Sequence, residues 1–318
     1  MADPLIEQAL TRRAPLFTSA ETDAFRVLHR AADGLPQLAV DRFADVLVAH
    51  LYDDQAPLAR VEALARRVGA RSLYVKRRPA QASVLSATDR AALAPAAPHW
   101  GAACESVVVR ENGLRYLIRP GAGLSVGLFL DMRETRAWVR AQAAGRMILN
   151  CFAYTCGFGV AAAAGGAARV VNLDLARAYL EWGQANYQLN GLAPAPRDFI
   201  FGDALDWLGR LARRGERFDL VILDPPSYAT SKRGRFTVQR DYADLARRAA
   251  QVVAPGGWLI ACANAAELSV RAFHQQLRAG LDGLPARITH TTHEPELDFP
   301  VARRETPYLK VAFVRLAA

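Results

Sequence analysis

The second half of the chain alternates short apolar runs with segments of helical character. Apolar runs predict strands at residues 147–150, 169–173, 198–201, 218–223 and 258–263, and the remaining segments predict helices at 134–144, 157–164, 176–190, 204–213 and 241–253. The run at 218–223 has almost no alternation, which is typical of a strand buried on both faces. Four strand–helix repeats followed by a fifth strand predict an α/β fold with a Rossmann-like, doubly wound, mostly parallel sheet.

The first half has a different pattern. Strands are predicted at 38–40, 45–51 and 72–76, a helix at 56–68, an Ala- and Pro-rich loop at 79–104, and an arm or short helix at 1–20. Asn112-Gly113 between two β-rich runs predicts a hairpin. We therefore predict three parts: a small α+β domain at 1–110, with substrate recognition as its candidate role, a hairpin and linker at 111–133, and a catalytic domain at 134–318.

Charge adds a candidate partner. The formal net charge is +9 and the isoelectric point about 9.8, so an acidic partner such as RNA is expected, because phosphate neutralisation dominates nucleic-acid affinity. A second explanation stays open. Only Lys76, Lys232 and Lys310 among the 40 basic residues are lysine, and this arginine bias with abundant alanine is also typical of a GC-rich genome.

Cysteine spacing and hydropathy exclude several classes. Cys104, Cys151, Cys156 and Cys262 form no C-x-x-C pair and have no histidine at ligand spacing, so neither a disulfide framework nor a metal site is expected. Residues 1–10 do not resemble a signal peptide, and the most apolar stretch, 157–171, is too short and too weakly apolar to cross a bilayer. We expect a cytoplasmic protein without a membrane segment or a metal.

Four short segments follow predicted strands one to four, where ligands bind in such sheets. The first is the small-residue turn 150–159, whose glycines allow close approach of a ligand at a helix N-terminus. After the next two strands come Asp174, which suits ribose hydroxyls, and Asp203, which suits an adenine amino group. For both acids a helix cap is the alternative. A NAD enzyme ranks lower, because Tyr154-Thr155-Cys156 replaces the glycine-rich diphosphate turn.

The fourth segment, Asp224-Pro225-Pro226-Ser227-Tyr228, is the most informative. Two prolines remove backbone donors and hold the chain extended. The carboxylate and nearby carbonyls then remain as acceptors for a planar base that presents N–H groups, and Tyr228 can stack on that base. We interpret the segment as the place where a planar substrate base is held.

These residues resemble the bacterial 23S rRNA methyltransferases of the RlmI and RlmK/L type, in a form without the N-terminal PUA domain. The resemblance rests on Gly127-Leu128-Phe129-Leu130-Asp131-Met132-Arg133, Asn150-Cys151-Phe152-Ala153-Tyr154-Thr155-Cys156-Gly157, 180–192, 224–228 and, in the first half, 34–43. It implies an S-adenosylmethionine (SAM) cofactor held by Phe152, Tyr154, Thr155, Gly157, Asp174, Leu175, Asp203, Ala204, Asp224 and Pro225. It further implies that Phe129, Asp131 and Arg133 close over the cofactor. For Arg133, an ion pair with Asp131 or Glu134 is the alternative.

The resemblance leaves the methylated atom open. If the target is cytosine C5, Cys262 would add to the ring as a thiolate and Asp224 would remove the ring proton. Ala261-Cys262-Ala263 stands where the RlmI type has Ser-Cys-Ser, and a buried structural cysteine is the alternative. If the target is a guanine nitrogen, Asp224 and Tyr228 hold the base without a nucleophile. For either target, the predicted substrate contacts are Pro226, Ser227, Tyr228, Lys232, Arg233 and Asn264.

The sequence therefore predicts a SAM-dependent methyltransferase that acts on a base of ribosomal RNA, with Asp224, Cys262 and Tyr228 as catalytic candidates. A methyltransferase for a protein or small molecule is one alternative, and a non-catalytic RNA-binding assembly factor is another. The set Asp174, Asp203 and Asp224 argues against the second alternative, since a binding scaffold does not need three acids at the strand tips. A homodimer is an open expectation.

Overall fold

The computed structural model describes residues 3–53, 55–78, 91–231, 234–303 and 305–318, with the backbone alone at 229–231 and 234–235. The chain divides into two compact units: Met1–Arg133 with Pro295–Glu305, and Glu134–Glu294 with Thr306–Ala318. The predicted division into 1–110, 111–133 and 134–318 stays a prediction. The units differ from it in grouping 111–133 with the N-terminal residues and in taking 295–305 away from the C-terminal part.

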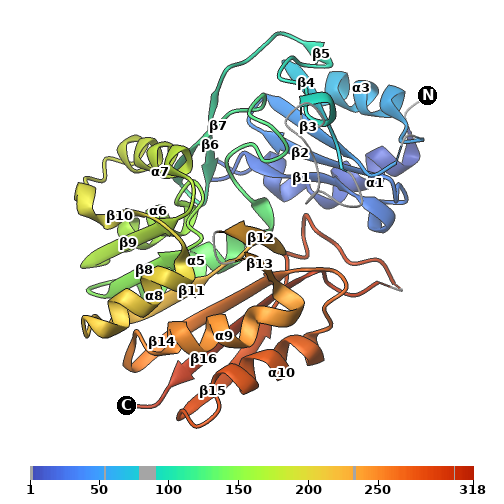
Figure 1. The fold of residues 1–318 in the computed structure, drawn as a ribbon. Coiled ribbons are helices and arrows are strands. Elements are labelled where there is room, and N and C mark those ends of the chain that lie inside the picture. The colour runs from blue at the N-terminus through green and yellow to red at the C-terminus, as the bar shows by residue number, and fades with distance from the viewer. Residues whose placement is uncertain (1–2, 54, 79–90, 232–233, 304) are drawn as a thin grey trace. The chain divides into compact units, whose positions relative to one another are not determined.

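The first unit is built on a five-stranded sheet in the order β1-β2-β3-β4-β5 (Figure 1). Only β3 and β4 are parallel, and α3 supplies the crossover that a parallel pair requires. Apolar side chains of α1 and α3 pack on the sheet in one core. The elements are α1 (Pro4–Arg12), α2 (Ala14–Phe17), β1 (Ala24–His29), η1 (Arg30–Asp33), β2 (Leu38–Phe43), β3 (Val46–Leu51), α3 (Leu58–Arg67), β4 (Ser72–Arg77), β5 (Trp100–Gly101) and η3 (Leu130–Met132).

The hairpin forms where the Asn-Gly pair predicts it. Strands β6 (Val107–Glu111) and β7 (Leu114–Ile118) pair antiparallel, and the two turn residues Asn112 and Gly113 have φ of 50° and 78°. Two consecutive positive φ values define the turn that matches the twist of paired strands, which explains the preference for Asn-Gly.

The second unit contains a seven-stranded sheet in the order β10-β9-β8-β11-β14-β16-β15. The first five strands are parallel, and β16 is antiparallel to both of its neighbours. This is the predicted doubly wound α/β sheet. The elements are α5 (Arg133–Gln142), β8 (Met147–Cys151), α6 (Gly157–Ala164), β9 (Arg169–Asp174), α7 (Arg177–Leu189), η4 (Pro196–Asp198), β10 (Phe199–Phe201), α8 (Ala204–Arg213), β11 (Phe218–Leu223), β12 (Tyr228–Ser231), β13 (Gly234–Thr237), α9 (Val238–Ala250), β14 (Val253–Asn264), α10 (Val270–Gly280), β15 (Ala286–Thr292) and β16 (Leu309–Leu316).

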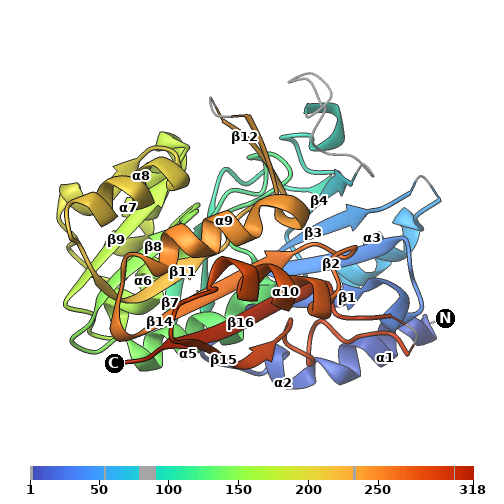
Figure 2. The same ribbon diagram turned by 60° about the horizontal axis from the view of Figure 1, so that its bottom comes forward.

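Helices cover both faces of this sheet (Figure 2). Apolar residues of α8, α9 and α10 pack on one face. On the other face Trp138 of α5 contacts Trp258 and Phe313 edge-on. Helices α6 and α7 lie on the same face as α5 (Figure 1). Strands β8, β11 and β14 lie between the two layers, so both faces of each are buried and their sequences lack alternation.

Three local expectations need correction. No regular element is predicted between residues 224 and 240, yet β12 and β13 form a hairpin directly before α9. The fifth strand begins at Val253 rather than 258, because Pro255-Gly256-Gly257 forms an irregularity inside β14 instead of a separating turn. The predicted loop 79–104 contains the short strand β5, and 79–90 lie outside the described residues.

Close packing of α7 on the loop before α6 yields a stability prediction. A Cβ at Gly183 would collide with the Cys156 side chain, whereas a Cβ at Gly209 on α8 meets only Arg213 Nη1 at 3.6 Å. We expect Gly183→Ala to lower the free energy of unfolding by about 1–3 kcal/mol through overpacking. Gly209→Ala should raise it by up to ~1 kcal/mol through helix propensity. Denaturant titration of both variants checks this, and equal effects would contradict the packing argument.

Candidate functional site

The loop between β8 and α6 has a strained backbone. Phe152, Tyr154 and Cys156 have φ of 60°, 49° and 61°, a left-handed conformation that costs non-glycine residues on the order of 1–3 kcal/mol each. Such strain persists only where surrounding contacts impose it, and it concentrates at ligand-binding sites. The predicted turn at 150–159 is therefore a tightly specified loop at the tip of the first strand.

Asp174 is the main contact that imposes this backbone. Its Oδ2 accepts the Tyr154 N–H at 2.7 Å, and its Oδ1 accepts the Ala176 N–H at 2.8 Å. Burial raises the pKa of the Asp174 carboxyl, and the backbone donors partly oppose that rise. The Leu175 backbone is a third donor to this carboxylate. Since a carboxylate has about four acceptor sites, the three bonds leave capacity for one further bond from a ribose hydroxyl. The predicted role and the alternative of a local backbone contact are thus compatible.

Helix α7 completes the support of the loop. Asn186 Nδ2 donates to the Thr155 carbonyl at 2.9 Å, and the Tyr154 ring packs edge-on against Tyr179, with ring centroids 4.6 Å apart. Thr155 is buried, so its contribution to a ligand would come from the backbone. Gly157 begins α6, whose N-cap residue makes no side-chain cap bond.

Asp203 is the N-cap of α8. Its Oδ1 accepts the N–H groups of Leu205 and Asp206 at 2.9 and 3.3 Å. In the part of the chain that the structure describes, both hydrogen bonds of this carboxylate use Oδ1, which leaves Oδ2 for a ligand. Capping and ligand binding are again compatible functions of one carboxylate.

Exposed apolar side chains follow the strand tips. Leu175 after β9 is 49% exposed, Phe201 at the end of β10 is 49% exposed, and Tyr228 after β11 is 45% exposed. Large apolar groups that stay in water at one edge of a sheet are suited to the faces of planar ligands. Ala204 and Pro225, two further predicted cofactor contacts, are buried beside them.

The Asp224–Tyr228 segment meets the tip of β14. The Ser227 hydroxyl donates to the carbonyl of Asn264, so two predicted substrate residues come together. Asn264 itself is exposed, and Asp224 and Ser227 are half-buried. Leu223 pairs with Ala261 in register, which places Asp224 level with Cys262.

Cys262 has no exposed surface. It lies in β14 between β11 and β16, and its carbonyl accepts the Tyr242 hydroxyl at 2.8 Å. Burial raises the pKa of the Cys151 and Cys156 thiols at the first strand tip, which makes them poor nucleophiles. The predicted substrate residues Lys232 and Arg233 lie outside the described residues.

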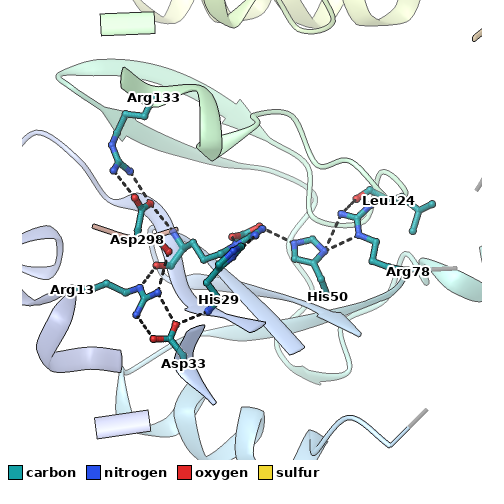
Figure 3. Close-up of polar contacts among 10 residues, drawn as sticks. Arg13, His29, Asp33, His50, Arg78, Leu124, Arg133 and Asp298 are labelled. Atoms are coloured by element: carbon teal, nitrogen blue, oxygen red, sulfur yellow. Dashed lines mark hydrogen bonds and ion pairs between the residues drawn. The ribbon is translucent and has the colours of Figure 1, made fainter. Parts of the chain in front are cut away.

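The remaining predicted cofactor residues belong to the first unit. Phe129 is 44% exposed, whereas Asp131 and Arg133 are buried. Arg133 forms a bidentate ion pair with Asp298, with N–O distances of 2.8 and 2.6 Å (Figure 3). Sequence reasoning missed Asp298, because it lies 165 residues away in a loop without a motif. The sequence predicts a cofactor contact for Arg133, with an ion pair to Asp131 or Glu134 as the alternative, and the cofactor contact stays a prediction.

Asp298 belongs to a buried ionic cluster of the first unit (Figure 3). The fully buried Arg13 donates to both oxygens of Asp33 and to the Asp298 carbonyl. In the same cluster Asp41 accepts from Arg26 and from His50 Nε2, and Arg78 donates to His50 Nδ1. The arginines and carboxylates alternate, so each buried charge has an opposite partner, as burial requires.

Comparison with known proteins decides the family. A family model described as S-adenosylmethionine-dependent methyltransferase matches residues 24–277, more than half of the chain. The chain belongs to this family. Among relatives, a "Ribosomal RNA large subunit methyltransferase" of Deinococcus radiodurans is 34% identical over 98% of this chain and 78% of its own length. A "Ribosomal RNA large subunit methyltransferase I" of Aeromonas salmonicida is 33% identical over 83% and 67%.

A methyltransferase solved in complex with SAH has the same fold as this one, with a TM-score of 0.89 at 28% identity over 98% of this chain and 80% of that chain. The protein is therefore a SAM-dependent methyltransferase, and its cofactor is SAM. The residues present fit that cofactor, since a phosphate-free nucleoside needs carboxylate acceptors and apolar faces rather than a diphosphate cradle. Asp174 and Asp203 Oδ2 would provide the acceptors, and Leu175 and Phe201 the apolar faces. In the described residues, no group of three or more His, Cys, Asp or Glu could hold a metal, and no helix is long and apolar enough to cross a membrane.

The predicted binding of SAM by the Asp203 carboxylate can be tested separately from its function as the N-cap of α8. Asparagine is as good an N-cap as aspartate, so Asp203→Asn should keep the melting temperature while removing the negative charge at Oδ2. We expect the Kd for SAM, measured by calorimetry, to rise about tenfold, the equivalent of one charge-assisted hydrogen bond. The control is Asp206→Asn, which removes a charge from the same helix turn. An equal effect of both variants would contradict a specific contact of Asp203.

The buried histidines predict a pH dependence. Burial, with Arg78 next in size, lowers the pKa of His50 to about 4, and burial, with Arg26 next in size, lowers that of His29 to about 3. A histidine whose pKa is lower in the folded state than in the unfolded state stabilises the fold fully above its unfolded pKa of about 6.5. This contribution to the free energy of unfolding is lost as pH falls from about 6.5 toward the folded pKa. For His50 we expect a loss on the order of 3 kcal/mol between pH 6.5 and 4.

His50→Gln provides the matched variant, because an amide can donate to Asp41 and accept from Arg78 as neutral histidine does. Its free energy of unfolding, followed by urea titration from pH 7 to pH 4, should fall less steeply than that of the wild type. Parallel curves would show that His50 does not titrate on unfolding.

Proposed function

We propose that this methyltransferase modifies a base of large-subunit ribosomal RNA, and that the methylated atom is a ring nitrogen. The observation that carries the proposal is the Asp224–Tyr228 segment, which combines a half-buried carboxylate, two residues without N–H donors and a half-exposed aromatic ring at one strand tip. The names of the relatives support ribosomal RNA as substrate. On this proposal the enzyme acts in the cytoplasm, where bacterial ribosomes are assembled.

Methyl transfer from SAM to a ring nitrogen requires mainly that the protein position the base next to the methyl group. SAM supplies an electrophilic methyl group on a sulfonium. Asp224 and neighbouring carbonyls accept N–H groups of the base, Tyr228 stacks on its face, and the exposed amide of Asn264 is available for a further hydrogen bond. The lone pair of the attacking nitrogen forms the new N–C bond as the methyl–sulfur bond breaks, and the electron pair of that bond stays on sulfur, so that S-adenosylhomocysteine leaves as a neutral thioether. We assign to Asp224 the proton that the base then loses. Near-attack alignment then provides much of the rate.

The complete burial of Cys262 favours nitrogen over carbon. Cytosine C5 methylation needs a thiolate that reaches the ring, and a side chain without exposed surface in a central strand does not meet that requirement unless the strand tip moves. Carbon methylation is therefore an outcome of the test rather than the proposal. A protein or small-molecule acceptor is the other outcome, and the predicted homodimer stays a prediction.

A labelled-methyl transfer assay tests the proposal. With labelled SAM, the wild type should label ribosomal RNA and not a protein extract. Cys262→Ala should keep at least half of that activity, because the nitrogen route uses no thiol. Asp224→Asn should lose about 100-fold, with calorimetry reporting how much of the loss comes from SAM binding. Loss of RNA labelling in Cys262→Ala would establish carbon methylation, and labelling of the extract alone would refute the RNA substrate.

A further inference from the structure

The tip of β14 has an unusual set of hydrogen bonds. Three carbonyls within four residues accept from side chains of three different elements: the Cys262 carbonyl from the Tyr242 hydroxyl of α9, the Asn264 carbonyl from the Ser227 hydroxyl, and the Ala265 carbonyl from the Lys310 ammonium of β16 at 2.7 Å. The segment after β11 begins with Asp224 and two prolines, and prolines have no N–H to donate. Side chains therefore donate the hydrogen bonds to the carbonyls at the end of β14, because the neighbouring segment after β11 has few backbone N–H groups.

Lys310 is the least expected member of this set. It is buried in a strand whose other residues from Leu309 to Val314 are apolar, and its ammonium also donates to the Tyr308 carbonyl at 3.1 Å. In the described part of the chain no ion pair holds this ammonium, although Glu294 and Glu267 interact with it electrostatically. Burial of an ammonium without a close carboxylate is costly. A methionine would fill the same space without that cost.

The place of Lys310 in the register explains what the ammonium holds. Lys310 pairs with Ala263 of β14, so its side chain extends past the strand end to the carbonyl of Ala265. The preceding residue, Asn264, receives the Ser227 hydroxyl and has an exposed side chain. The ammonium and Ser227 thus fix consecutive peptide groups on which Asn264 depends for its orientation.

We propose that Lys310 is a positioning residue for the methyl acceptor, which fixes the Asn264–Ala265 backbone so that Asn264 and the Asp224–Tyr228 segment present their polar atoms at a constant spacing. The inference rests on the proposed function for the identity of the acceptor. A polar residue that is unfavourable for stability and lies directly behind a binding segment is the pattern expected of a functional site.

The test compares two substitutions on one face of β16. Lys310→Met removes the donors at the tip, and Val314→Ala, four residues along the strand, creates a cavity in the core away from the tips. We expect Lys310→Met to lower kcat for RNA methylation about 10- to 100-fold, as small misplacement of binding groups does, with the Kd for SAM within twofold of wild type. Val314→Ala should lower the melting temperature and leave kcat at 20 °C within twofold.

Hydrogen exchange supplies a readout that needs no RNA. Lys310→Met should increase amide exchange in 262–268 and leave β8 and β9 unchanged, and Lys310→Arg, which keeps the donors, should restore both protection and kcat to within about threefold. If Lys310→Met does not fold, the arginine variant must still meet that expectation. Unchanged exchange at 262–268, unchanged kcat, or a loss of SAM binding as large as the loss of kcat would each overturn the proposal. Absence of RNA labelling by the wild type would refute the proposed function alone, because the exchange result stands independently.

Discussion

The carboxylate of Asp174 is the interaction on which the cofactor loop depends. It ends the second parallel strand and accepts the N–H of Tyr154, the middle of three left-handed residues that follow the first strand. Without this acceptor the loop would lose the contact that offsets part of its backbone strain. If Asp174 binds the cofactor's sugar as predicted, one side chain both shapes the protein backbone and holds the cofactor, which would link the fold of the sheet edge to cofactor binding.

The first unit combines an apolar core with a buried ionic cluster. Its sheet carries a buried cluster in which Arg13, Arg26 and Arg133 alternate with Asp33, Asp41 and Asp298. Such a cluster adds less free energy than an apolar core of equal size, but it specifies partners strongly, because removing any one member leaves a buried charge unpaired. The bidentate pair of Arg133 and Asp298 shows the effect: it attaches a loop from the far end of the chain to the residue that precedes the catalytic unit.

The segment proposed to hold the methyl acceptor has few backbone N–H donors. Pro225 and Pro226 leave carbonyls and the Asp224 carboxylate as the dominant polar groups, which suits an acceptor that presents N–H donors. The same absence affects the protein itself, since the neighbouring strand tip then takes hydrogen bonds from Tyr242, Ser227 and Lys310. On the proposed function, the two prolines would thus bear both on recognition of the base and on the local support of the strand end.

Much of the architecture follows from the sequence by local rules. The parallel strands β8 and β11 are recognisable because strands buried on both faces must be continuously apolar. The hairpin at Asn112-Gly113 is recognisable because few residues accept two positive φ values. The strand tips that hold Asp174, Asp203 and Asp224 follow from that pattern, since ligands bind where parallel strands end.

Long-range pairing is what the sequence could not determine. The partner of Arg133 was sought among its chain neighbours, yet Asp298 lies 165 residues away, and no spacing rule connects two charges across that interval. In the sequence, nothing distinguishes Lys310 from the other basic residues, and only the pairing of β16 with β14 brings it close to Asn264. The exposure of Cys262 likewise depends on the strands that flank β14 on both sides. Local periodicity determined which segments form strands and helices; only the folded chain decided which buried charges meet, because Coulomb and hydrogen-bond partners are chosen by distance in space.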